Sequence, residues 1–173
     1  MAAHPGCYPA PPTAQHPYHT DESNFTAPSA LVSVGPNNGA STKILTSFFG
    51  RNFSSLNQHP WTGDLWLTNA DYGFCQYFRP ASKIPKQAYR FVPSTGEILV
   101  VAYGFLQSNR LEFSADLKTL YISKTGAAGG PYLGTNFTCP WTIYAYDIVH
   151  SARLANRRVF VYSDNGPRNI TNK

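Results

Sequence analysis

The clearest shortage in this 173-residue sequence is charge, since its 14 basic and 9 acidic residues make up only 13 % of the chain. Charge-driven disordered chains and coiled coils both need many more charged residues, so neither class fits. No apolar run approaches the roughly 18 residues that cross a bilayer, and we expect no membrane partner. The basic residues are scattered rather than gathered into a patch, which argues against nucleic acid as a partner.

Cysteine is also scarce, and Cys7, Cys75 and Cys139 form no C-x-x-C pair, so a zinc site is not expected. One disulfide with a thiol left over and three buried thiols both stay open. The N-terminus lacks the basic and apolar stretches of a signal peptide. We therefore expect a cytoplasmic protein by default and a secreted one if a leader precedes this stretch. Secretion would expose four N-x-S/T sequons to glycosylation, at Asn24, Asn52, Asn136 and Asn169.

Aromatic residues are abundant, with 11 Tyr, 11 Phe and 3 Trp, and this favours an all-β fold. Residues 1–30 hold six of the 14 prolines and predict an extended, largely disordered tail. From Leu31 onward, short β-type runs alternate with turn signals. The predicted strands are Leu31–Val34, Lys43–Phe49, Leu65–Thr68, Ala88–Val92, Glu97–Ala102, Leu120–Ser123, Thr142–Asp147 and Arg158–Ser163, and Ser151–Arg157 is a candidate for one helical turn.

An internal repeat refines the fold class. Asp64–Asn69 is similar to Thr119–Lys124, and Tyr89–Val92 is similar to Tyr144–Asp147, each pair at an offset of 55 residues. A unit of several strands that recurs at a fixed period favours a β-propeller, whereas a β-sandwich need not repeat.

Motifs that mark common enzymes are absent: the sequence has no G-x-S-x-G elbow, phosphate-binding glycine loop or H-E-x-x-H. Two asparagines, Asn57 and Asn109, precede predicted strands, whose starts meet at one end of a propeller channel. Their amide oxygens suit Ca²⁺ or a similar divalent ion. The alternative, that both side chains only cap turns, stays open.

Several segments resemble the gluconolactonase family, which includes the senescence marker protein and the luciferin-regenerating enzymes. Residues 107–126 resemble its P-N-G-L-x-F-S-P-D-G-K-T-L-Y-V-T-D-T-G signature. Leu56-Asn57, Trp66-Leu-Thr-Asn-Ala-Asp-Tyr-Gly73 and Tyr89-Arg-Phe-Val-Pro-Ser-Thr-Gly96 are similar to the fungal lactonohydrolase branch, and the resemblance covers about residues 30–168.

The resemblance implies a six-bladed β-propeller with one divalent ion, commonly Ca²⁺, held by a Glu, two Asn and an Asp from different blades. It also implies metal-dependent hydrolysis of a sugar-type or related lactone, in which the ion polarises the carbonyl and a carboxylate helps to activate water. By motif, Asn57 and Asn109 fall on the two Asn ligands.

The sequence departs from the family at its acidic positions. The family Glu and the family Asp have no counterpart, Asn69 and Lys124 replace the acids of two T-D motifs, and about three residues are deleted after Asn57. Two neutral amides without a carboxylate would bind Ca²⁺ very weakly. The alternative hypothesis is a catalytically inactive, truncated or degenerate propeller that acts as an interaction module or has no independent function.

At 55 residues per blade, six blades need about 330 residues, so 173 residues correspond to about three blades of an incomplete ring. We expect a tail at 1–30, a partial propeller at 31–168 and a C-terminal end at 169–173. Open blade faces in such a ring favour self-association.

Overall fold

A computed structural model describes residues 18–21, 30–36, 39–46, 53, 55–75, 85–126, 141–150 and 152–163. These residues form eleven strands and one short helix. None of the helices in these ranges is long and apolar enough to cross a membrane. Cys7, Cys139 and the asparagines of the four sequons lie outside the described residues.

The N-terminal blade consists of β1 (Tyr18–Asp21), β2 (Ala30–Val34) and β3 (Ser41–Thr46), paired antiparallel in that order. Strand β1 lies inside the segment whose proline content predicts a disordered tail. It can form because residues 18–21 contain no proline and so keep their backbone donors. They pair in register with β2, from Tyr18 opposite Ser33 to Asp21 opposite Ala30. The predicted tail therefore contains one strand.

The middle blade is a four-stranded antiparallel sheet in the order β4-β5-β6-β7. The last three strands have the bounds that the sequence predicts, and the turn between β6 and β7 closes at Gly96, whose φ of 75° suits glycine. A one-turn helix, α1 (Tyr72–Cys75), follows β5. The strands are β4 (Ser55–Gln58), β5 (Leu65–Thr68), β6 (Ala88–Val92) and β7 (Glu97–Ala102).

The C-terminal blade has the order β11-β10-β9-β8, also antiparallel. The predicted helical turn at Ser151–Arg157 is wrong, because β11 begins at Arg153, opposite Val149 of β10. Pairing with β10 places Leu154 against the apolar core, and this burial overrides the local preference. The strands are β8 (Ser108–Phe113), β9 (Thr119–Lys124), β10 (Trp141–Val149) and β11 (Arg153–Ser163).

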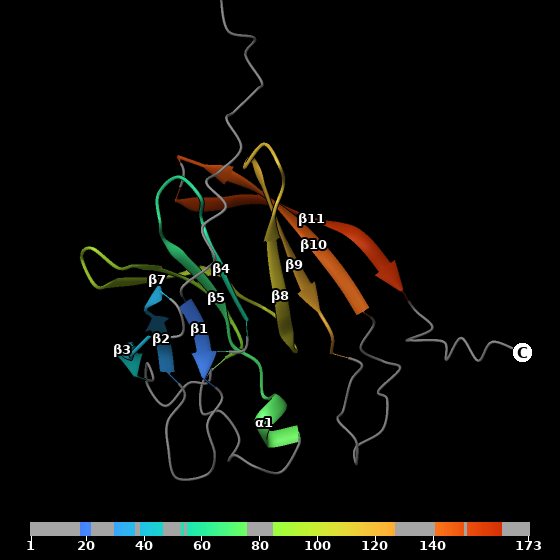
Figure 1. Cartoon of the computed structure of the whole chain (residues 1–173). Coiled ribbons are helices and arrows are strands. Elements are labelled where there is room, and N and C mark those ends of the chain that lie inside the picture. The colour runs from blue at the N-terminus through green and yellow to red at the C-terminus, as the bar shows by residue number, and fades with distance from the viewer. Residues whose placement is uncertain are drawn as a thin grey trace, which may run out of the picture.

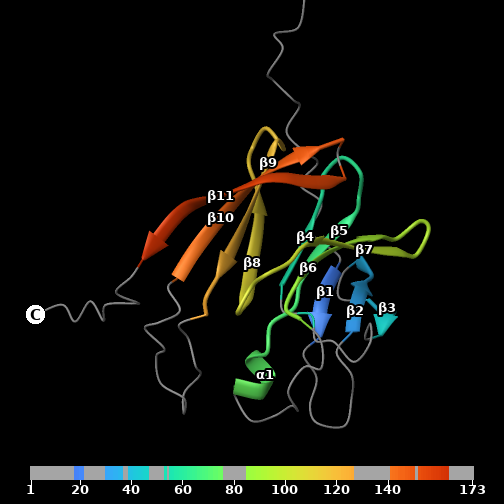
Figure 2. The same ribbon diagram turned by 180° about the vertical axis from the view of Figure 1, so that it is seen from behind.

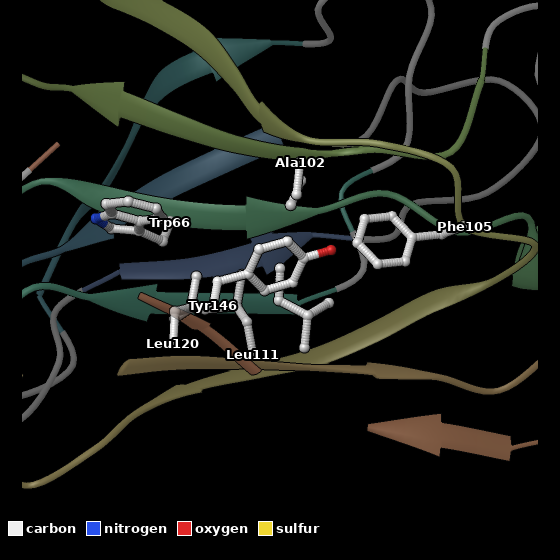
Figure 3. Close-up of a cluster of buried hydrophobic side chains, with 8 residues drawn as sticks. Trp66, Ala102, Phe105, Leu111, Leu120 and Tyr146 are labelled. Atoms are coloured by element: carbon white, nitrogen blue, oxygen red, sulfur yellow. The ribbon is translucent and has the colours of Figure 1, made fainter. Parts of the chain in front are cut away.

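The middle blade lies between the other two and is covered on both faces (Figures 1 and 2). One face packs on the N-terminal blade through a cluster that includes Leu31, Phe53, Leu65, Leu67 and Tyr89. The other face meets the C-terminal blade in a second cluster, shown in Figure 3, with Trp66, Ala102, Phe105, Leu111, Leu120 and Tyr146.

The 55-residue repeat is also a repeat of the structure. The backbone N–H of His59 donates to the carbonyl of Asp64 over 2.8 Å, and that of Ser114 donates to Thr119 over the same distance. Residues that face the preceding blade recur at the same offset, as in the pairs Leu65 and Leu120, Leu67 and Ile122, Tyr89 and Tyr144, and Phe91 and Tyr146. The prediction of an all-β propeller with about three blades and an open ring is confirmed.

Candidate functional site

The predicted metal-ligand residue Asn109 lies at the start of β8, the inner strand of the C-terminal blade. Asn109 and Arg110 together oppose the single residue Ser123 of β9, because the register shifts between Ser108 and Leu111. Such a β-bulge re-aims a side chain at a strand end. The Arg110 backbone N–H donates to the Ser123 hydroxyl over 3.0 Å, which holds the bulge in place.

Three hydrogen bonds to the middle blade hold the carbonyl of Asn109 and the two residues that precede it. The Thr68 hydroxyl donates to the Asn109 carbonyl, and the buried Ser108 hydroxyl donates to the Asn69 carbonyl over 2.6 Å. The Gln107 side chain accepts from the Asp71 backbone N–H over 2.9 Å. Asn109 therefore projects from a backbone that is tied to the adjacent blade, which is what a binding residue needs.

The segment after β5 completes this end of the molecule, which we call the mouth: the start of β8 together with residues 68–72. Helix α1 lies at the same end of the sheets as the start of β8 (Figures 1 and 2). The Tyr72 and Thr125 hydroxyls share a hydrogen bond across the two blades. The acidic residue here is Asp71, whose carboxylate lies 3.2 Å from the Lys86 ammonium.

Asn57, the other predicted ligand, does not lie level with Asn109. It is opposite Trp66 on β5, whereas Thr68, which touches Asn109, is opposite Ser55. The Asn57 side-chain amide donates instead to Glu112 Oε1 over 3.0 Å.

Carboxylates do not gather at the mouth. Throughout the described ranges, no group of three or more His, Cys, Asp or Glu side chains is placed to hold a metal ion. Asp164 and the residues after it, where the family Asp would be sought, are outside those ranges.

Two groups with shifted pKa values, His59 and Tyr146, belong to a turn and to the core. Burial lowers the pKa of His59 below 6.5, with the Asp64 carboxylate opposing the shift, and its Nδ1 accepts from the backbone N–H groups of Trp61 and Thr62. Burial raises the pKa of Tyr146 to about 12, with Arg157 opposing. His59 follows β4 at the end opposite the mouth, and Tyr146 lies between blades, so these shifts reflect packing.

Sequence reasoning missed four residues that support Asn109: Thr68, Asp71, Gln107 and Ser108. The signal was present, since Thr68 and Asp71 belong to the Trp66–Gly73 motif and Gln107 and Ser108 open the 107–126 motif. Nothing in their spacing, however, indicates that the two motifs meet across a blade interface.

Comparison with known proteins identifies the relatives of this chain. No family model matches it. It is 32 % identical over 165 residues to lactonohydrolase oryL of Aspergillus oryzae, covering 86 % of this chain and 37 % of that protein. It is 30 % identical over 115 residues to lactonohydrolase oryH of the same organism, covering 57 % of this chain and 24 % of that protein.

Solved structures agree on the fold. A gluconolactonase from Xanthomonas campestris matches with a TM-score of 0.59 and 21 % identity, over 83 % of this chain and 44 % of that one. A luciferin-regenerating enzyme matches with a TM-score of 0.51 and 13 % identity, over 81 % of this chain and 45 % of that one. The chain thus spans less than half of the length of each of these proteins. With its repeat, its blades and these relatives together, the chain belongs to the lactonohydrolase family of gluconolactonase-like β-propellers.

Proposed function

We propose that this chain contributes to the hydrolysis of a small lactone, of the sugar type or related to it, by presenting Asn109 at the mouth of a metal-dependent lactonohydrolase. The observation that carries the proposal is the mouth itself. The backbone of Asn109 is tied to the middle blade through Thr68 and Ser108, in a chain of this family.

The described residues by themselves do not fit a divalent ion. Ca²⁺ takes six to eight oxygen ligands, several of them carboxylates. At the mouth the neutral Asn109 amide has only Asp71 as an acidic neighbour along the adjoining segment, and Asp71 is paired with Lys86. In this proposal, ion binding and lactone hydrolysis need carboxylates from outside the described residues.

Two other observations favour a second function, a catalytically inactive propeller module. The side-chain amide of Asn57 is hydrogen-bonded to Glu112. In the described ranges, no group of three or more His, Cys, Asp or Glu side chains could hold a metal ion. The two functions make opposite predictions for turnover by the 173-residue chain.

The deciding experiment is hydrolysis of an aldonolactone by the full chain in added Ca²⁺ or Zn²⁺, and again with a chelator. The enzyme proposal expects metal-dependent turnover that Asn109→Ala lowers at least about tenfold. Asn156→Gly, an asparagine change on β11 that keeps the positive φ of 51° accessible, is the matched control and leaves turnover unchanged. Absence of metal-dependent turnover supports the inactive module.

We also propose that a second copy of this chain covers the open side of the C-terminal blade. Strand β11 is the edge strand there and exposes four consecutive large apolar residues, Val159, Phe160, Val161 and Tyr162, each between 48 % and 59 % exposed. An exposed apolar edge strand readily pairs with another chain.

Sedimentation velocity over a range of protein concentrations tests this self-association. Phe160→Lys places a charge in the apolar run and shifts the chain toward monomer. Trp61→Lys, at an aromatic residue of similar exposure (52 %) in a middle-blade turn, leaves the distribution unchanged. A wild-type chain that is monomeric at every concentration contradicts the proposal.

A further inference from the structure

We propose that Asn57 is not a metal ligand in this protein but a cross-blade residue, whose side-chain amide joins the middle blade to the C-terminal blade through Glu112. The inference deepens the proposed function, because it leaves Asn109 as the one proposed ligand of the predicted pair.

The strand register carries the inference. Asn57 is opposite Trp66, and Glu112 is opposite Tyr121. Both members of the second pair follow those of the first by 55 residues, since 57 + 55 = 112 and 66 + 55 = 121. In a propeller with this repeat, Asn57 is therefore the counterpart of Glu112.

The next pair along the same strands keeps this register. Gln58 is opposite Leu65, and Phe113 is opposite Leu120, again with offsets of 55 on both strands. The counterpart of Asn109 at this offset is Ser54, which is outside the described residues. Asn57 lies three positions after Ser54. This displacement equals the deletion of about three residues that follows Asn57 when the sequence is compared with the family motif.

The deletion has a geometric consequence. The level of Asn109 on the middle blade is marked by Thr68, which lies opposite Ser55, two residues before Asn57. At about 3.3 Å per residue, Asn57 lies roughly 6–7 Å further along its strand. Two ligand atoms of one Ca²⁺ lie at most about 5 Å apart, because each is about 2.3–2.6 Å from the ion, so an offset of this size along the strand works against a shared ion.

The side chain of Asn57 instead forms a hydrogen bond to the C-terminal blade. Its Nδ2 donates to Glu112 Oε1 over 3.0 Å and lies 3.5 Å from the Leu111 carbonyl, both on the inner strand of the next blade. Hydrogen bonds to a carboxylate are stronger than neutral ones, and Asn57 is half-buried while Glu112 is exposed. The bond therefore couples the inner edges of two blades.

A double-mutant cycle in urea tests this coupling. Asn57→Ala and Glu112→Ala each lower the unfolding midpoint, and together they change the unfolding constant about three- to tenfold less than the product of the single effects. Glu97→Ala, at an exposed glutamate on β7, is the matched control, and its effect multiplies with that of Asn57→Ala. Multiplicative effects at 57 and 112 would overturn the inference.

Terbium binding to the full chain, followed by sensitised luminescence, separates this inference from the proposed function. Where the wild-type chain binds terbium, Asn57→Ala leaves the affinity within about twofold, because Asn57 contributes no ligand. A loss as large as that of Asn109→Ala would contradict a cross-blade role. A wild-type chain that binds no terbium counts against the proposed function, and the cycle then decides the role of Asn57 alone.

Discussion

The middle and C-terminal blades are two copies of one unit with different surroundings. Trp66 of the middle blade and Tyr121 of the C-terminal blade are counterparts at the 55-residue offset. Trp66 is fully buried against the C-terminal blade and meets Phe113 edge to face at 5.6 Å. Tyr121 is only half-buried and packs on Phe160 of its own blade, at 4.8 Å. Equivalent sequence positions therefore acquire different energetic roles according to whether a blade covers them.

The ion pairs differ in the same way. Arg90 and Asp64 of the middle blade form a buried pair, with Nη2 2.6 Å and Nε 2.8 Å from the same carboxylate oxygen. The C-terminal blade has an exposed pair instead, Arg158 with Asp147, at 2.6 Å. Distance alone does not distinguish these pairs, and burial does.

The largest expected effect separates the two aromatic counterparts. Trp66→Ala removes a fully buried indole and lowers the free energy of unfolding by about 3–5 kcal/mol. Tyr121→Ala, the matched change on the uncovered face, lowers it by about 1 kcal/mol. Urea denaturation of both variants, at protein concentrations at which the chain is monomeric, measures the difference, and equal losses would show that the far face of the C-terminal blade is covered within a single chain.

A second prediction concerns the ion pairs. Asp64→Ala leaves the largely buried Arg90 guanidinium without its carboxylate and lowers the free energy of unfolding by about 3 kcal/mol. Asp147→Ala removes an exposed and screened partner and gives a denaturation curve close to that of the wild type. If the loss at Asp64 disappears in high salt, the pair behaves as a surface pair and the comparison fails.

The smallest predicted effect is a dependence on pH in the turns. His59 and Ser114 are counterparts that cap equivalent turns of the middle and C-terminal blades. Burial keeps the pKa of His59 below 6.5, so its neutral ring accepts the Trp61 and Thr62 backbone N–H groups. As pH falls, His59 is protonated in the unfolded chain before it is protonated in the folded chain. The contribution of these hydrogen bonds to stability is therefore present above pH 6.5 and is lost as pH falls below that value.

The C-terminal turn has a different pH window. Hydrogen bonds from the Ser114 hydroxyl and the Lys118 backbone N–H lower the pKa of Asp116 below 3.8. This contribution is present above pH 3.8 and is lost only on further acidification.

The test of the His59 prediction is the unfolding midpoint measured from pH 7.5 to 5.5. The midpoint should fall with pH for the wild type, and it should change little with pH for His59→Asn. An unchanged slope in that variant would exclude His59 as the titrating group.

Much of the fold could be predicted from the sequence, because local signals and the repeat agree. The bounds of β5, β6 and β7 follow from short β-type runs and from the turn signals between them, including the turn that ends at Gly96. Strand β4 was not predicted, since Ser55–Gln58 has no strong β pattern and forms by pairing with β5. The start of β11 was missed because its pairing with β10 is not visible in local composition.

The candidate site was predictable only in part. The position of Asn109 on β8 follows from a motif that continues without insertion or deletion through β8 and β9, and its role as a ligand stays a prediction. Asn57 precedes a deletion, and a motif match across a deletion does not determine which residue reaches which level of the strand. A slip of register along a strand moves every side chain to a new neighbour.

By itself, the sequence determined the class of this protein: an all-β chain with a 55-residue repeat and the motifs of the lactonohydrolase family. These properties reside in the order of apolar, turn-forming and motif residues along the chain. Only the tertiary structure decided that Asn57 meets Glu112, that Thr68 and Ser108 hold Asn109, and that Trp66 is covered while Tyr121 is not. The physical reason is that each of these contacts joins residues 36 or more positions apart, or depends on a neighbouring blade, and local order carries no information about such neighbours.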